Sequence, residues 1–313
     1  MKNKNFLVTG GTGFIGASIC KMLLRLGHDV TILDNNSRGK ISRILKIEKK
    51  IKFIKADIRD KKKVLNSMKN IDAVVHLAYI NGTKFFYEKP DLILDVAVKG
   101  LVNIFDGCIK YKIKELYLAS SSEVYQTPIK IPTDENEPLK IPNIYNPRYS
   151  YGGGKILTEL MGINYGRKFF NKLIIFRPHN VYGPDMGNEH VIPEFVNRFN
   201  KLKGKKFIIQ GNGSETRSFI YIDDFVRAFK YIIKKGKHLQ IYNIGTNEKV
   251  TIKTLAKKLS KIFNKKIIIK KTKLAKGSTK KRLPNISKIK LLGFRQKIKL
   301  EQGLKFLVNQ KLN

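Results

Sequence analysis

The sequence predicts an α/β fold, a doubly wound parallel sheet with a smaller C-terminal α/β lobe. Three observations carry this prediction. Short apolar runs alternate with segments of helical periodicity, a glycine-rich turn joins the first run to the first helix, and the regular alternation ends near Arg177. Strand–helix alternation of this kind is typical of parallel strands joined by crossover helices.

The expected elements follow in order along the chain. Strands are expected at 6–8, 30–33, 52–54, 73–77, 115–119 and 173–176, and helices at 14–26, 61–69, 92–110 and 150–170. After a loop at 178–190, we expect a helix at about 191–202, a strand at 206–209 and a helix at about 222–234. We therefore assign 1–176, with about 214–240, to the sheet domain, and about 177–213 with 241–313 to the lobe.

Composition places the chain among ordinary globular proteins. It has 313 residues, of which 42% are hydrophobic. No stretch approaches the roughly 18 apolar residues of a membrane helix. The N-terminus leads directly into a strand, without the apolar segment of a signal peptide. Cys20 and Cys108 are expected to be buried free thiols. We expect a cytoplasmic protein that is not embedded in a membrane.

The formal charge of +39 is unusual, and it is concentrated near the C-terminus. Residues 251–313 contain 20 Lys or Arg against one acid, Glu301. Such a bias is also found in nucleic-acid-binding proteins. Here, however, the lysines alternate with apolar residues, and no aromatic stacking platform lies between them. We therefore expect no nucleic-acid partner, and a positive field that helps to attract an anionic small substrate.

A glycine motif follows the first strand. Gly10, Gly13 and Gly16 have the spacing G-x-x-G-x-x-G between a strand and an apolar helix. In a Rossmann-type fold the first glycine forms the turn, the second admits the pyrophosphate of a dinucleotide, and the third lets helix and strand pack closely. The helix N-terminus supplies amides and a positive partial charge to the phosphates.

Polar residues at later strand ends support the same site. Asp34 ends the second strand, where a carboxylate can bind both adenosine ribose hydroxyls and repel a 2′-phosphate, which favours NAD over NADP. Arg38, a few residues on, leaves NADP open as an alternative. Asp57 ends the third strand and could accept from the adenine amino group. Because ligands lie across the carboxyl ends of parallel strands, these signals indicate one crevice.

Reactive side chains cluster after the fifth strand. Ser121 follows that strand, and Tyr151 and Lys155 stand four residues apart, on one face of a helix. A tyrosine is a poor base at neutral pH unless a neighbouring cation stabilises its phenolate. Three consecutive glycines, 152–154, separate the pair at a cost of roughly 1 kcal/mol each in a helix. They could make room for a cofactor or for a closely packed helix.

These motifs resemble an extended short-chain dehydrogenase/reductase of the NAD-dependent epimerase/dehydratase family. The resemblance covers nearly the whole chain. It rests on T-G-G-T-G-F-I-G at 9–16, Y-x-x-x-K at 151–155, R-P-H-N-V-Y-G-P at 177–184, R-S-F-I-Y-I-D-D at 217–224, Y-N-I-G at 242–245 and R-L-P at 282–284. Three positions depart from the pattern: Ala97 replaces an asparagine, Asn285 an aspartate and Gln126 a glycine.

The resemblance implies roles for individual residues. The catalytic residues would be Ser121, Tyr151 and Lys155, with Glu123 as a weaker candidate. The NAD contacts would be Gly10, Gly13, Phe14, Ile15, Gly16, Asp34, Asn35, Asp57, Ile58, Leu77, Ala78, Tyr151, Lys155 and Pro178. The substrate contacts would be Ser122, Asn180, Arg217 and Arg282. Guanidinium groups suit a diphosphate, which fits the two arginines. No metal site is expected.

Two reactions remain open at this point. In the first, an NAD-dependent epimerase resembling UDP-glucose 4-epimerase oxidises C4 of a nucleoside-diphosphate sugar and returns hydride to the other face. In the second, Glu123 removes the acidified C5 proton, giving a 4,6-dehydratase or a related decarboxylase. We favour the epimerase by about two to one. A non-catalytic NAD-sensing regulator is a third reading, disfavoured because Tyr151 and Lys155 are both present. The resemblance also implies a homodimer that acts in carbohydrate metabolism, such as polysaccharide biosynthesis.

Overall fold

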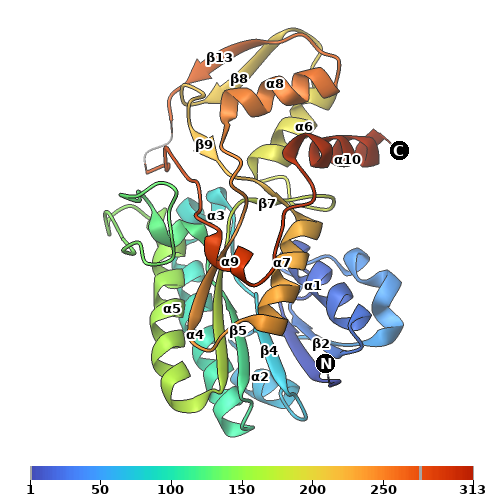
Figure 1. Cartoon of the computed structure of the whole chain (residues 1–313), viewed down its shortest axis with the longest axis vertical. Helices are drawn as coiled ribbons and strands as arrows, with labels where there is room; N and C mark the ends of the chain where they lie inside the picture. Colours follow the sequence, from blue (N-terminus) through green and yellow to red (C-terminus); the bar gives the residue numbers. More distant parts are fainter. Residues whose placement is uncertain (1, 275–276, 313) are drawn as a thin grey trace.

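Seven parallel strands form the central sheet of the computed structural model, which describes residues 2–274 and 277–312 (Figure 1). The strands are β1 (Asn5–Thr9), β2 (Asp29–Asp34), β3 (Ile51–Lys55), β4 (Ala73–His76), β5 (Glu115–Ala119), β6 (Lys172–Pro178) and β11 (Gln240–Ile244). Their order in space is β11-β6-β5-β4-β1-β2-β3, with every neighbouring pair parallel. The predicted doubly wound sheet is confirmed: β2 and β3 are added on one side of β1, and β4, β5, β6 and β11 on the other.

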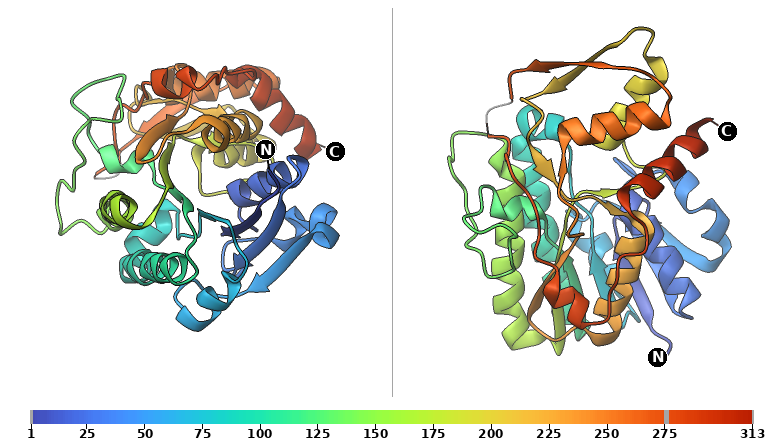
Figure 2. Two further views of the ribbon diagram at one scale, coloured as in Figure 1. Left: turned by 60° about the horizontal axis from the view of Figure 1, so that its bottom comes forward. Right: turned by 45° about the horizontal axis from the view of Figure 1, so that its top comes forward.

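Helices cover both faces of this sheet, as the left view of Figure 2 shows. The helices α1 (Phe14–Arg25) and α7 (Ile222–Lys235) pack on one face, and α2 (Lys61–Ser67), α4 (Pro90–Lys110) and α5 (Tyr149–Phe169) on the other. Strand β6 shows the reason. Ile174 and Phe176 point into the first layer, and Leu173 and Ile175 into the second. A strand buried on both faces must be apolar throughout, as this one is.

The second lobe lies beyond the carboxyl ends of the strands, at the top of Figure 1. It contains α6 (Val191–Lys201), α8 (Ile252–Ile262), α10 (Leu300–Leu312) and the strand pairs β8 (Lys206–Gln210) with β13 (Ile268–Thr272) and β9 (Thr216–Arg217) with β12 (Val250–Thr251). A further pair, β7 (Val181–Tyr182) with β10 (Ile220–Tyr221), links the lobe to the sheet domain. Short helices fill the remaining connections: η1 (Ile41–Arg43), η2 (Leu45–Lys50), α3 (Thr83–Glu88), η3 (Ser122–Tyr125) and α9 (Ser287–Leu291).

One predicted boundary is wrong. We assigned 241–313 to the lobe, but β11 pairs with β6 and forms the seventh strand of the central sheet. The sequence pattern did not indicate this strand because Asn243, a polar residue, interrupts its apolar run. The side chain of Asn243 is fully buried, where it accepts from Tyr125 (2.8 Å) and donates to the carbonyl of Thr133 (3.1 Å). A buried polar residue with partners is compatible with a core strand.

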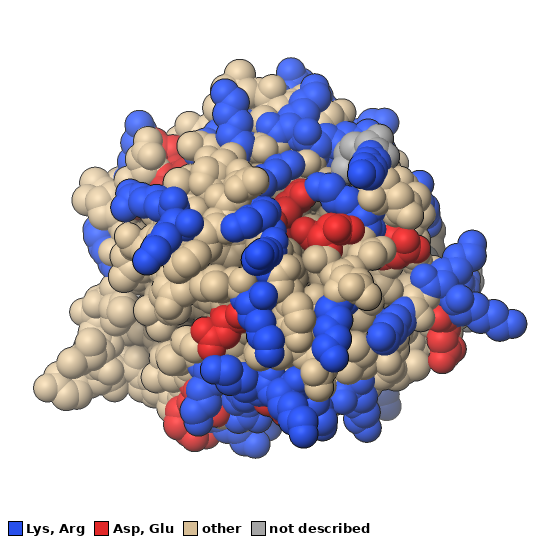
Figure 3. Space-filling model, turned by 90° about the horizontal axis from the view of Figure 1, so that it is seen from below, with Lys and Arg blue, Asp and Glu red and all other residues tan. Residues whose placement is uncertain are grey.

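Positive charge is dispersed over the face of the molecule opposite the second lobe. On the face opposite the second lobe, Figure 3 shows lysine and arginine side chains singly and in small groups, separated by uncharged surface and by several acids. Among residues 2–274 and 277–312, no helix combines the length and the apolar character that a bilayer crossing requires. Cys20 and Cys108 are free and buried, as expected.

Candidate active site

The glycine turn forms a backbone cradle at the start of α1. Gly10 has a left-handed backbone (φ +73°), and a Cβ there would lie 2.8 Å from the amide nitrogen of Ala78. A Cβ on Gly16 would lie 2.1 Å from the carbonyl oxygen of Gly10. Gly13 faces the cavity described next. The turn therefore leaves bare backbone where a dinucleotide's pyrophosphate would approach, so the residues present fit that group.

A cavity of about 350 Å³ lies between this turn and the second lobe. Most of the predicted site residues line it. From the cofactor set these are Gly10, Gly13, Phe14, Ile15, Gly16, Leu77, Tyr151, Lys155 and Pro178, and from the other sets Ser121, Ser122, Glu123, Asn180 and Arg282. Asp34, Asn35, Asp57, Ile58, Ala78 and Arg217 are not among the lining residues. Segments more than 270 residues apart in the chain thus meet in one crevice.

Asp34 holds the loop that follows β2. Its two carboxylate oxygens accept from the backbone amides of Thr12 (3.0 Å) and Asn36 (2.8 Å), and the side chain is almost fully buried. These bonds fix the carboxylate next to the glycine turn, with lone pairs left for further donors.

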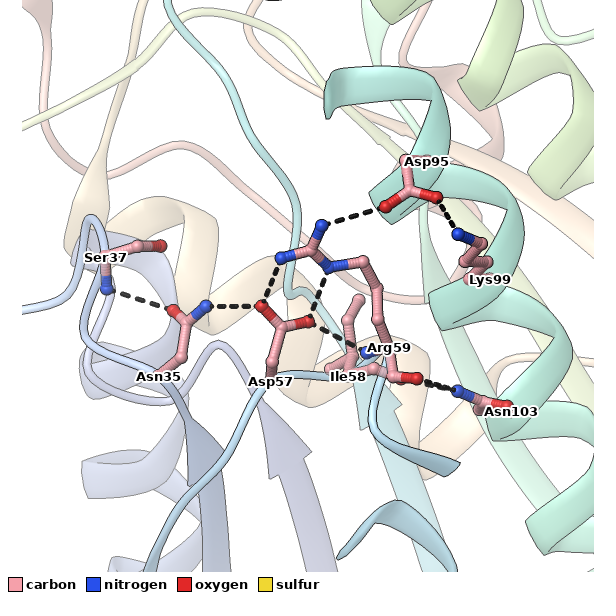
Figure 4. Close-up of polar contacts among 8 residues, drawn as sticks. All are labelled: Asn35, Ser37, Asp57, Ile58, Arg59, Asp95, Lys99 and Asn103. Atoms are coloured by element: carbon pink, nitrogen blue, oxygen red, sulfur yellow. Dashed lines mark hydrogen bonds and ion pairs between the residues drawn. The ribbon is translucent and has the colours of Figure 1, made fainter. Parts of the chain in front are cut away.

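Asp57 is embedded in a polar network (Figure 4). Arg59 donates to both of its carboxylate oxygens, at 3.0 and 2.9 Å, and Asn35 donates to one of them at 2.9 Å. The hydrogen bond from Arg59 holds the pKa of Asp57 below its usual value. Arg59 is fixed in turn by Asp95 on α4, at 2.8 Å. Asp57 is therefore a rigid anion at the end of β3, and its contact with adenine stays a prediction.

Tyr151, Ser121 and Lys155 meet at one wall of the cavity. Tyr151 shares a hydrogen bond with Ser121, and burial raises the pKa of Tyr151 to about 12. Burial lowers the pKa of Lys155 to about 7. We expected the tyrosine and the lysine to face one cleft, and both side chains line this cavity. The Lys155 ammonium donates to the carbonyl of Ala119 (2.7 Å) and lies 6.0 Å from the centre of the Tyr151 ring.

Two of the three glycines of α5, Gly152 and Gly154, make room for neighbouring segments. A Cβ on Gly152 would lie 2.5 Å from the amide nitrogen of the Gln126 side chain, and one on Gly154 would lie 2.1 Å from the Tyr79 hydroxyl. Gln126 itself has a positive φ (+49°), a backbone conformation that glycine adopts at lower cost. Gly154 also faces α4, where a Cβ would lie 2.9 Å from that of Ala97.

Glu123 lies among arginines on the side of the cavity where we predict that the substrate binds. Arg282 donates to Glu123 (2.9 Å) and to the Thr279 hydroxyl (2.9 Å). Burial would raise the pKa of Glu123, but Arg282, together with Arg148 and Arg217, holds it below the usual value. Burial, reinforced by Arg282, lowers the pKa of Arg217 to about 10. Three guanidinium groups around one carboxylate leave an excess of positive charge.

Sequence reasoning missed several residues around the cavity. Tyr79, Phe86 and His190 line it, and no motif marked them. Arg148, which adds to the positive field at Glu123, stands three residues before Tyr151, a helical spacing that could have indicated it. Arg38, considered as a 2′-phosphate ligand, instead pairs with Glu189 of the lobe at 2.7 Å.

We expect Asp34→Ser to weaken NAD binding about 10- to 100-fold, since hydrogen bonds to a charged group contribute roughly 1.5–3 kcal/mol. The loss should be smaller for NADP, whose 2′-phosphate the carboxylate repels. Calorimetric titration of both dinucleotides measures the change. Asp29→Ser, at the opposite end of β2, is the matched control and should bind NAD normally. Equal NAD affinity in the two variants would contradict the role of Asp34.

Comparisons with known proteins agree with this geometry. The sequence model of the NAD dependent epimerase/dehydratase family matches residues 6–245. A Methanocaldococcus jannaschii protein, named provisionally as a UDP-glucose 4-epimerase, is 33% identical over 312 residues, 97% of each chain. A UDP-N-acetyl-alpha-D-glucosaminuronate decarboxylase of Bacillus cytotoxicus is 31% identical over 314 residues, 96% of each chain.

Solved structures show the same architecture. The crystal structure of UDP-glucose 4-epimerase from Thermotoga maritima, solved with UDP-glucose, superposes with a TM-score of 0.89 at 29% identity, covering 99% of this chain and 100% of that one. Since the family model covers most of the sheet domain and the cradle fits its cofactor, the chain belongs to the NAD-dependent epimerase/dehydratase family and is an enzyme that uses NAD.

Proposed function

We propose that the protein is a nucleotide-sugar epimerase that inverts a sugar carbon, C4, through a transient 4-keto sugar. One observation carries the proposal: the Ser121–Tyr151 pair and Lys155 border the same cavity as Arg282, next to the glycine cradle. A diphosphate held by arginine would place its attached sugar near the tyrosine. The named activities of the relatives support this substrate class.

The side chains would act on the sugar hydroxyl. NAD, when bound, supplies the hydride acceptor and donor, so that no net oxidation occurs. Tyr151 takes the proton of the 4-hydroxyl, and Ser121 bonds the same oxygen as it becomes a carbonyl. Because burial favours the neutral phenol, the Lys155 ammonium is needed nearby to stabilise the phenolate. Arg282 and Arg217 hold the diphosphate, with Asn180 beside them.

The choice between epimerase and dehydratase depends on Glu123. A general base for the C5 proton works best when its carboxylate is free and its pKa is raised towards neutrality. Here Glu123 is bonded to Arg282, and its pKa is held low. This pairing favours the epimerase. The 4,6-dehydratase or decarboxylase stays the second candidate, since Glu123 lines the cavity beside Ser121 and one relative is named as a decarboxylase.

A substrate panel tests the proposal. The purified enzyme is incubated separately with UDP-, GDP- and dTDP-linked hexoses, and the sugars are resolved by chromatography and NMR. We expect one C4 epimer pair to interconvert in both directions to a common equilibrium. Accumulation of a 4-keto sugar, or release of carbon dioxide from a uronic-acid substrate, would instead establish the second candidate.

Glu123→Gln separates the two reactions. For an epimerase we expect kcat to stay within about tenfold of the wild type, because Gln leaves the proton transfer at Tyr151 intact. For a dehydratase, removing the base should lower kcat by about 10²- to 10⁴-fold. Steady-state rates on the active sugar measure the change. Glu48→Gln, on an exposed helix remote from the cavity, controls for the loss of one charge.

A further inference from the structure

Tyr79 stands in the cavity wall three residues beyond β4, directly over Lys155. The Lys155 ammonium lies 3.8 Å from the centre of the Tyr79 ring, a shorter separation than its 6.0 Å to the Tyr151 ring. The edge of Tyr79 also meets Tyr151, with ring centres 5.2 Å apart and planes at 87°. Tyr79 therefore touches both residues on which the proposed chemistry depends.

Other groups around Lys155 offer the ammonium little support. Its one hydrogen bond among the described residues goes to the carbonyl of Ala119. Glu159, one turn along α5, favours the ammonium by its charge, but its carboxylate oxygens are also bonded by Arg177 and Ser120. His76 on β4 carries no charge at neutral pH, because burial, helped by Lys155, lowers its pKa to about 3. The face of the Tyr79 ring, 3.8 Å away, is a further group that favours a cation at this position.

The neighbouring sequence is adapted to this ring. Only a glycine at position 154 leaves space for the Tyr79 hydroxyl, which is buried and has no hydrogen-bond partner among the described residues. Ala97 on α4 borders the same space, and this is the position where the family pattern has asparagine. Two small residues on two helices thus admit one large side chain from the loop after β4.

We propose that Tyr79 is a positioning residue that holds the Lys155 side chain against the end of β5 and stabilises its ammonium form. Gly154 and Ala97 are the positions that make room for it. The inference rests on the role proposed for Lys155, but the contact itself can be tested without knowing the sugar.

The test compares Tyr79→Leu with Tyr79→Phe. Leu removes the aromatic face, whereas Phe keeps it and removes only the hydroxyl. The pKa of Lys155 is followed by NMR of protein carrying [ε-13C]lysine, and its resonance is assigned by its absence in Lys155→Met. We expect the pKa to fall by about one in Tyr79→Leu, a roughly tenfold smaller ratio of ammonium to amine. It should stay within about 0.3 of the wild type in Tyr79→Phe.

A pH–rate profile gives the second measurement. If the ammonium is needed, the rate falls as the pH rises through the pKa of Lys155, and in Tyr79→Leu this fall should begin at lower pH. A purely structural role would lower the rate equally at every pH. Tyr111→Leu, which removes a ring 5.6 Å from the Lys110 ammonium outside the cavity, is the control and should leave both profiles unchanged.

Two results would overturn the inference. One is an unchanged or raised Lys155 pKa in Tyr79→Leu, which would mean that the ring does not stabilise the ammonium. The other is an equal shift in the Leu and Phe variants, which would assign the effect to the hydroxyl. If no sugar were turned over, the proposed function would fail while the NMR titration would still decide the role of Tyr79.

Discussion

Replacing Tyr151 with Phe should lower kcat by about 10³-fold or more while leaving NAD bound. The phenol oxygen is the group that takes and returns the sugar proton, and general base catalysis contributes about 10²- to 10⁴-fold. The ring itself should stay in place. It stacks on Phe86, with centres 5.0 Å apart, and meets Tyr79 at its edge. Phenylalanine keeps both contacts, so the variant removes little more than the hydroxyl.

Two measurements on Tyr151→Phe separate chemistry from binding. Steady-state rates should show the loss, and calorimetric titration should give an NAD affinity within about threefold of the wild type. Tyr165→Phe is the matched control, because Tyr165 lies on the same helix and stacks on Phe105 outside the cavity. Its rate should be normal. Turnover that survives in Tyr151→Phe would refute the catalytic assignment and, with it, the proposed function.

Replacing Arg177 with Met should lower the free energy of unfolding by about 3–5 kcal/mol. Arg177 is 2% exposed, and it donates to the two oxygens of Glu159 at 2.8 and 2.5 Å. It also donates to the Tyr125 hydroxyl at 2.6 Å and to the carbonyl of Glu135 at 3.0 Å. Methionine fills part of the volume but leaves the Glu159 carboxylate buried without its cation.

A double variant tests this explanation. Because most of the cost comes from the uncompensated carboxylate, Arg177→Met combined with Glu159→Leu should recover a large part of the lost stability. Chemical denaturation gives the free energies, and the single variant should melt on the order of 10 °C lower. Arg198→Met, at a partly exposed position of α6, removes an ion pair with Glu194 (3.2 Å), a hydrogen bond to the carbonyl of Ile208 and a contact with the Phe207 ring, and should cost less, about 1–2 kcal/mol. Equal losses for Arg177→Met and Arg198→Met would contradict the structural role.

The motif that contains Arg177 combines residues with two different roles. R-P-H-N-V-Y-G-P helped to indicate the family, and its asparagine, Asn180, does line the cavity. The arginine faces the other way, into the core between β6 and α5. The alternation along a strand predicts which face of the sheet a side chain lies on. It does not predict the residue on a neighbouring helix, here Glu159, with which that side chain forms an ion pair.

Six of the seven strands of the sheet, their parallel direction and the glycine cradle could be predicted from the sequence alone. These features depend on local periodicity and on the backbone conformation of single residues, such as Gly10 with its φ of +73°. It also placed Ser121, Tyr151 and Lys155 at the same edge, because parallel strands end together.

The surroundings of Ser121, Tyr151 and Lys155 could be seen only in the folded structure. The pairing of Glu123 with Arg282, the contact of Tyr79 with Lys155 and the entry of β11 into the sheet each join segments that are distant in the chain. Such contacts depend on side-chain packing between elements, and the residue pattern within one element does not predict which other element it packs against. The buried free thiols and the approximate helix bounds depend on local sequence, so they could be predicted. The charge state of Lys155 depends on groups from several elements, so it required the whole fold.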